Sequence, residues 1–148
     1  MSAQEEQVQS ADFLASVLKH VAVGISVQDP NGQLVYVNDA AARSVGFSSA
    51  QDMLATPAQE IVKKFEILDE SRQPLSFDRL PGRRALKGEQ SPETVVCYRV
   101  RATGEELWSV VKAMPLMDEQ GKVKFAVNTW YDVTEYMRGK EPLKELER

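Results

Sequence analysis

Apolar and polar residues alternate in several stretches of the chain, each about as long as a β-strand. Two short alternating runs flank Asp29-Pro30-Asn31-Gly32 in the segment VGISVQDPNGQLVYVN. Proline fixes φ, and Asn and Gly tolerate positive φ, so this segment predicts a tight hairpin. Three longer runs rich in Val, Tyr, Phe and Trp follow: ETVVCYRVRA, ELWSVVKAMPLM and KVKFAVNTWY. Short turns join them, which predicts an antiparallel meander.

Helical spacing of apolar residues appears before and between these strands. Residues 10–21 repeat apolar side chains at the period of a helix, and Ser10 is a suitable N-cap for it. A short helix after Asn38 or Asp39 is predicted to end at Gly46. The stretch DRLPGRRALKGE predicts a further helix that begins at a proline and ends at a glycine. The predicted order is therefore a helix, two strands, short helices and three strands, which is an α+β arrangement.

Composition and charge narrow the class of protein. The 148 residues are 43% hydrophobic and 27% charged, which is typical of one globular domain. A net charge of −4 argues against a nucleic-acid surface. The polar start of the sequence predicts no signal peptide, and no apolar run is long enough to insert in a membrane. A single cysteine excludes an internal disulfide and favours a reducing, cytoplasmic location.

The sequence offers little to an active site. His20 is the only histidine, at the end of the predicted N-terminal helix, and it has no evident partner for acid–base chemistry. Cys97 lies within a strand, which favours an inert buried thiol over a reactive one. A metal site is not predicted, because no second His or Cys completes a ligand set. The glycines are scattered singly, so no phosphate-binding loop is present. We therefore do not expect an enzyme in this chain.

The segments GISVQDPNGQLVYVNDAAARSVG and DVTEY, together with the meander between them, resemble a PAS sensor domain of bacterial signal-transduction proteins. The resemblance covers roughly residues 12–136 and includes SFDRLPGRRALKGE, which is similar to one bacterial branch of the family. It implies the PAS fold, a five-stranded antiparallel sheet with short helices on one face and an N-terminal flanking helix. The implied organisation is a flexible segment, a flanking helix, a PAS core and a C-terminal connector, at 1–9, 10–21, 22–132 and 133–148.

The same resemblance bears on cofactors. Haem-binding relatives supply a histidine from the helix before the meander, whereas DRLPGRRALKGE contains none. Blue-light flavin relatives carry a cysteine just ahead of that helix, whereas EIVKKFEIL contains none. Haem and covalent flavin are therefore not expected. A noncovalent metabolite or flavin stays open, with Trp108 and Trp130 available to line a ring pocket.

Strand register then selects the residues of a candidate pocket, because side chains alternate between the two faces of a sheet. Matching the strand ends to the family points one set of side chains inward: Ser26, Gln28, Cys97, Arg99, Ser109, Val111, Ala113, Ala126, Asn128 and Trp130. An inward guanidinium predicts a small anionic metabolite clamped by Arg99 and flanked by Trp130. Two alternatives stay open: the register is one residue off, which exposes Arg99, or Arg99 pairs with an acidic side chain.

The opposite face of the sheet is predicted to carry an apolar stripe of Val110, Met114, Phe125, Val127 and Tyr131. Such a stripe needs a cover. The flanking helix offers one through Phe13, Leu14, Val17 and Leu18, either on its own domain or on a partner. Since PAS domains commonly dimerise in this way, the resemblance implies a homodimer.

The chain ends by starting a charged helix. Asp132 is a suitable N-cap, with Glu135 three residues further on, whereas Gly139 and Pro142 predict a break or hinge. In the family, this junction, here Asp132 and Thr134, relays signals to a kinase, cyclase or phosphatase. Two functions stay open: a sensor that relays its ligand state to an effector in a longer protein, or a ligand-free dimerisation and interaction module.

Overall fold

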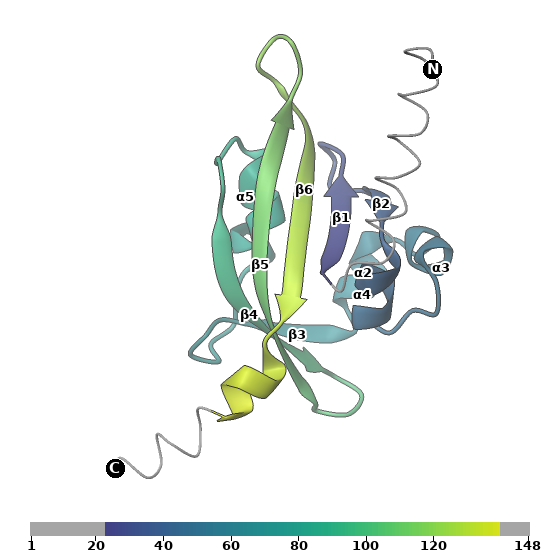
Figure 1. Cartoon of the computed structure of the whole chain (residues 1–148), viewed down its shortest axis with the longest axis vertical. Coiled ribbons are helices and arrows are strands. Elements are labelled where there is room, and N and C mark those ends of the chain that lie inside the picture. Colours follow the sequence, from purple (N-terminus) through teal and green to yellow (C-terminus); the bar gives the residue numbers. More distant parts are fainter. Residues whose placement is uncertain (1–22, 140–148) are drawn as a thin grey trace, which may run out of the picture.

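The computed structural model describes residues 23–139, so the predicted segments 1–9 and 10–21 and the chain after Gly139 lie outside the described residues. One antiparallel sheet has the strand order β2-β1-β6-β5-β4-β3 (Figure 1). The strands are β1 Gly24–Gln28, β2 Leu34–Val37, β3 Phe65–Leu68, β4 Glu93–Val100, β5 Glu106–Met117 and β6 Val123–Asp132. The predicted α+β class and antiparallel sheet are confirmed. The sheet has six strands instead of five, because β3 pairs with β4 as a short edge strand.

Short helices fill the connection between β2 and β4. They are α2 Asp39–Ser44, α3 Ala50–Leu54, α4 Ala58–Val62, the 3₁₀ turn η1 Phe77–Arg79 and α5 Pro81–Leu86. All of them lie on the same side of the sheet (Figure 1). We call the sheet face toward these helices the inner face and the opposite one the outer face.

Three turns that directly follow strands are built in the same way. In each, an aspartate accepts hydrogen bonds at 2.8–3.0 Å from the backbone N–H groups two and four residues later, and these aspartates are Asp29, Asp69 and Asp118. The fourth residue has positive φ, which suits Gly32 and Gly121. The corresponding residue of the Asp69 turn is Arg72, with φ of 62°. An L-residue in this conformation costs roughly 1–2 kcal/mol.

The helix starts follow the capping pattern of the sequence. The Asn38 side chain accepts hydrogen bonds from Ala41 N at 2.8 Å and from Ile25 N at 3.0 Å, so it joins the start of α2 to β1. Ser49 caps α3 through a bond from Asp52 N. Pro81 opens α5, as predicted. These caps fix short helices whose own length would not hold them.

Two apolar clusters attach the helices to the inner face. One lies under α2, α3 and α4 and consists of Val37, Ala41, Ala42, Met53 and Ile61. The other consists of Ala85 on α5 with Ala113 and Ala126 on the sheet. Because all three residues of the second cluster are alanines, α5 packs close to the strands. A space stays open between the two clusters.

Candidate ligand-binding pocket and connector junction

The space between the clusters is a cavity of about 220 Å³. Its walls come from all six strands and from the helices between β2 and β4. Most of the wall is apolar, and the polar side chains that line it are Ser26, Gln28, Ser44, Arg83, Tyr98, Ser109, Asn128 and Asp132, with Trp130 beside them. Small-molecule sites in proteins share such a mostly apolar lining with a few polar groups.

The predicted register is confirmed on three strands. Ser26 pairs with Asn128, and Val111 pairs with Trp130, all on the inner face. The predicted residues that line the cavity are Ser26, Gln28, Ser109, Val111, Asn128 and Trp130. Ala113 and Ala126 also lie on the inner face, but α5 covers them in the alanine cluster, so they do not line the cavity. Whether the lining residues bind a ligand stays a prediction.

The prediction of an inward Cys97 and Arg99 is wrong. Cys97 pairs with Trp108 and Arg99 with Glu106, both on the outer face. The physical reason is the loop length: Val100 and Glu105 close the β4–β5 connection, and one residue more or less there exchanges the two faces of β4. Both alternatives left open by the sequence are observed: the register differs by one residue from the predicted one, and Arg99 pairs with acidic side chains.

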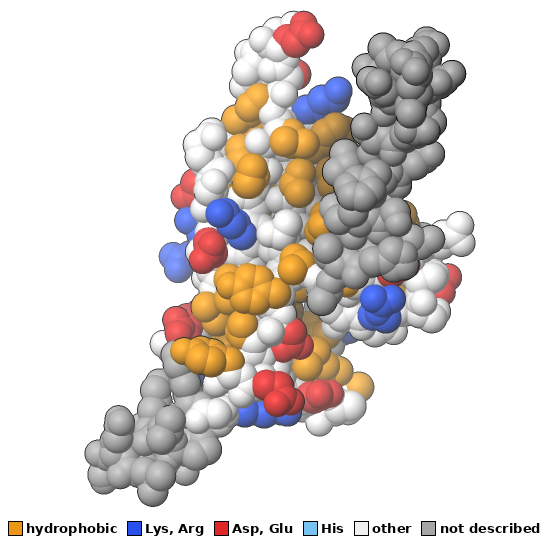
Figure 2. Space-filling view, viewed as in Figure 1, with side chains coloured by type: hydrophobic (Ala, Val, Ile, Leu, Met, Phe, Trp, Pro, Cys, Tyr) orange, Lys and Arg blue, Asp and Glu red, His pale blue; other side chains and the backbone are white. Residues whose placement is uncertain are grey.

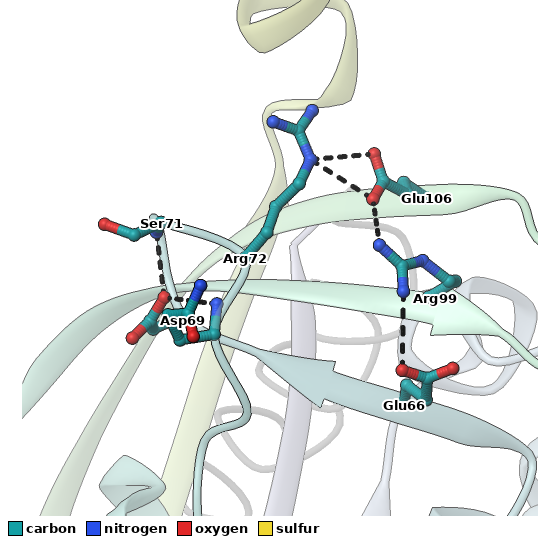
Figure 3. Close-up of polar contacts among 7 residues, drawn as sticks. Glu66, Asp69, Ser71, Arg72, Arg99 and Glu106 are labelled. Carbon is teal, nitrogen blue, oxygen red and sulfur yellow. Dashed lines mark hydrogen bonds and ion pairs between the residues drawn. The ribbon is translucent and has the colours of Figure 1, made fainter.

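Arg99 instead belongs to an ion-pair cluster on the outer face (Figure 3). Its Nη2 lies 2.9 Å from Glu106 Oε2, and its Nη1 lies 3.4 Å from Glu66 Oε2. Arg72 Nε lies 3.3 Å from the same Glu106 oxygen. Burial opposes ionisation of Glu106, but hydrogen bonds and charge from the two arginines outweigh it and lower its pKa. The guanidinium of Arg99 is thus paired inside the protein and is not available to a ligand in the cavity.

Tyr98 takes the place on the cavity wall that the sequence analysis gave to its neighbours. It lies opposite Leu107, and its ring packs edge-on against Phe65, with 5.9 Å between ring centroids. Burial raises the pKa of the Tyr98 phenol to about 12. The phenol therefore keeps its proton at neutral pH and is able to donate a hydrogen bond. The cost of burying an unpaired arginine would have predicted this position of Tyr98, because it favours the register in which Tyr98 points inward and Arg99 outward.

A group of side-chain amides lies where α5 meets the sheet. Asn128 Nδ2 donates to Ser26 Oγ at 3.3 Å. Gln28 Oε1 is buried and has no hydrogen-bond partner among the described residues. The backbone of Gly82 packs directly on both amides, because a Cβ built there would lie 2.6 Å from Gln28 Oε1 and even closer to Asn128 Oδ1. Trp130 continues this wall, and its Nε1 donates to Ser44 Oγ at 3.0 Å.

The junction after β6 is tied to the outer face. Asp132 Oδ1 accepts a hydrogen bond from Thr134 N, at the first residue of the helix, at 2.7 Å. The helix begins one residue later than an N-cap at Asp132 predicts, and the pairing with Glu135 stays a prediction. Thr134 is buried, and its Oγ1 accepts a hydrogen bond from Trp108 N at 2.9 Å. Residues 134–139 are helical, and Val133 and Met137 pack on the cluster of Leu68, Cys97 and Trp108. Gly139 lies within this helix, while Pro142 lies outside the described residues.

The rest of the outer face carries the predicted apolar stripe. Hydrophobic side chains gather over β5 and β6 in Figure 2. Met114 is 49% exposed and Tyr131 is 51% exposed, and Val110, Phe125 and Val127 lie beside them half-buried. Leu116 extends the stripe opposite Phe125. The four helix residues predicted to cover it, Phe13, Leu14, Val17 and Leu18, lie outside the described residues.

Residues 23–139 contain neither a metal-binding cluster nor a membrane-spanning helix. In this range, no group of three or more His, Cys, Asp or Glu side chains is placed to hold a metal ion. The same part of the chain contains no helix with the length and apolar character needed to cross a membrane.

An antiparallel sheet whose short helices enclose an inner cavity, with a helix leaving its last strand, defines a class of small sensory domains. A sequence model of the PAS domain family matches residues 22–135, which is most of the chain. The chain therefore belongs to the PAS domain family, and it is a PAS signalling domain. No curated protein sequence matches it.

Solved structures show the same fold. An RNA-binding light-oxygen-voltage receptor is similar with a TM-score of 0.69 and 22% identity, over 99% of this chain and 40% of the receptor. Vibrio cholerae VqmA, in a structure bound to DPO, is similar with a TM-score of 0.58 and 18% identity, over 83% of this chain and 57% of VqmA. The PAS domain of Bordetella pertussis BvgS has a TM-score of 0.59 and 16% identity, over 97% of this chain and 99% of that domain. This chain thus spans only 40% and 57% of the two longer proteins.

Proposed function

We propose that this PAS domain is a sensor that binds a small molecule noncovalently in its inner cavity. The observation that carries the proposal is the largely apolar cavity of about 220 Å³ with a few polar side chains on its wall, among them Gln28, whose Oε1 is buried and has no partner among the described residues. A buried unpaired polar group costs roughly 1–3 kcal/mol. A small turn of the Gln28 amide toward the cavity would let a ligand N–H or O–H group offset this cost.

The side chains on the cavity wall indicate which kind of ligand would fit. Phe65, Tyr98 and Trp130 supply ring surfaces, while Gln28 and Asn128 supply hydrogen-bonding groups. We infer a ligand that is largely apolar and has a few polar atoms at one end. The only cysteine of the chain, Cys97, is buried on the outer face, so its thiol is not placed to attach a chromophore in the cavity. VqmA, which contains a domain of this fold, is bound to DPO in one of its structures, and this supports the proposal.

The path from cavity to connector runs along one strand. Asn128 and Trp130 line the cavity on β6, and Asp132 at the end of the same strand accepts a hydrogen bond from the first residue of the connector helix. Ligand occupancy would change the balance between two positions of this helix, and so signal to an effector such as a kinase, cyclase or phosphatase in a longer protein. Asp132 and Thr134 are the relay residues of this proposal.

The two tryptophans allow a direct test, because Trp130 lines the cavity and Trp108 lies on the outer face. The indole N–H signals of ¹⁵N-labelled protein are recorded on fresh protein and on protein unfolded, dialysed and refolded. We expect the Trp130 signal to shift and the Trp108 signal to shift less. A Ser109→Met variant, whose longer side chain fills the cavity, should show no difference between the two preparations. Identical spectra for the two wild-type preparations would count against the proposal.

A second function, dimerisation, is favoured by the exposed stripe of Met114, Leu116 and Tyr131. We propose that a second copy of the chain covers it. Analytical ultracentrifugation is then expected to show a dimer that Met114→Glu weakens by at least about tenfold, since burying an unpaired charge is costly. Glu119→Gln, in the exposed β5–β6 turn, is the matched control. A monomeric wild-type protein at tens of micromolar would contradict this function.

A further inference from the structure

Arg83 of α5 is the arginine that the structure places on the cavity wall. Its guanidinium lies over the Phe77 ring, 5.0 Å from the ring centroid. On its other side it reaches the β1–β2 turn, where a Cβ built on Gly32 would lie 2.7 Å from Nη1. The guanidinium is thus held between an aromatic ring and the backbone of a turn.

The charge of Arg83 is not balanced in the described part of the chain. No carboxylate within residues 23–139 forms an ion pair with it, whereas Arg84 and Arg99, the other half-buried arginines, are paired with Glu89 and Glu106. The remaining arginines without a carboxylate partner in this range are exposed to solvent: Arg43, Arg79, Arg101 and Arg138. A guanidinium keeps its charge at any physiological pH. Arg83 therefore combines partial burial, a cavity position and an unbalanced charge.

The position of Arg83 makes the two ends of the cavity differ in charge. Gly82, the preceding residue, touches the amides of Gln28 and Asn128, so Arg83 lies at the same end as these amides. Asp132 lines the cavity four residues beyond Asn128 on β6, about 13 Å away at the rise of a β-strand. The cavity thus has a cation near one end and a carboxylate at the other.

We propose that the ligand of this cavity is a small carboxylic acid whose carboxylate binds Arg83. An N–H or O–H group of the same ligand donates to Gln28, and its apolar body lies against Tyr98 and Trp130. This inference rests on the proposed function, because it names the class of ligand for the same cavity. It assigns to Arg83 the role that the sequence analysis assigned to Arg99.

Matched pairs of acids and amides test the charge alone. The probes are indole-3-acetate with indole-3-acetamide and 4-hydroxyphenylacetate with its amide, each titrated into ¹⁵N-labelled protein while both indole N–H signals are followed. We expect the wild type to bind at least one acid about 10- to 100-fold more tightly than its amide, from the strength of a charge-assisted hydrogen bond. Arg83→Gln is expected to remove this preference, whereas Arg83→Lys retains part of it.

Arg84→Gln is the matched control, because Arg84 is the next residue on α5 and is paired with Glu89. It is expected to leave the acid preference unchanged. Equal binding of acids and amides by the wild type, or an Arg83→Gln preference equal to that of the wild type, would overturn the inference while leaving the cavity as a ligand site. No Trp130 shift with any probe, combined with identical fresh and refolded spectra, would contradict both proposals. The wild-type preference decides the question even where a variant does not fold.

Discussion

Replacement of Trp108 by alanine is expected to lower the free energy of unfolding by about 3–5 kcal/mol, the usual cost of truncating a buried tryptophan. Trp108 is 4% exposed and packs with Leu68 and Cys97 under the connector helix. Its backbone also holds Thr134 through two hydrogen bonds. We therefore expect faster amide hydrogen exchange in residues 134–139 as well as lower stability.

Trp130→Ala is the matched control for this prediction. Trp130 is only half-buried and already borders a cavity. Truncating its side chain therefore removes fewer packing contacts than truncating a core residue does. Urea denaturation is expected to give a smaller stability loss for Trp130→Ala, with little change in exchange at residues 134–139. Equal losses for the two variants, or an unchanged connector in Trp108→Ala, would refute the assignment of Trp108 as the anchor of the connector.

Gly82→Ala is expected to have the second large effect, on the cavity itself. The new Cβ would overlap the amides of Gln28 and Asn128, and Asn128 is buried with little room to move. Inserting a methyl group into such a packed site costs roughly 1–3 kcal/mol. The variant should also lose the difference between fresh and refolded protein at the Trp130 indole, because α5 no longer seats against the amides.

Gly139→Ala provides the comparison, since a Cβ at Gly139 meets nothing within 4 Å. Thermal unfolding of this variant is expected to match the wild type or to rise slightly, because alanine favours a helix over glycine by about 1 kcal/mol. A Gly82→Ala protein with wild-type stability and an unchanged Trp130 signal would show that α5 does not close the cavity through these amides.

Much of the fold was predictable because the turns carry their own chemistry. The Asp29 and Asp118 turns each place a glycine at the residue with positive φ, and both strand pairs around them were predicted correctly. The Asp69 turn has the same bonds but carries Arg72 at that position. The segment KFEIL before this polar turn indicates a strand, but without the glycine the turn marked no hairpin, and β3 was not counted in the predicted sheet. The helix α4 was not predicted, because its sequence contains no side-chain cap that marks its start.

The candidate site was predictable only where register was secure. On β1, β5 and β6 the turn and the strand end fix which side chains face inward, and Gln28, Ser109 and Asn128 were correctly placed. On β4 the length of the loop at residues 101–104 determines which side chains face inward. The alternation of apolar and polar residues does not give the length of a loop, so the inward set could not be predicted there. Arg83 was not predicted as a cavity residue, because the sequence of a six-residue helix with two consecutive arginines does not show which of them faces the cavity.

Native mass spectrometry of freshly purified protein, followed by the same sample under denaturing conditions, tests most directly whether the cavity holds a ligand. The sensor proposal predicts a non-protein mass that accompanies the folded domain, disappears on denaturation and is absent from Ser109→Met. The carboxylate inference further predicts that the released molecule is an acid. A folded wild-type domain at its bare sequence mass, with the same spectrum as Ser109→Met, would contradict the proposal and leave dimerisation as the supported function.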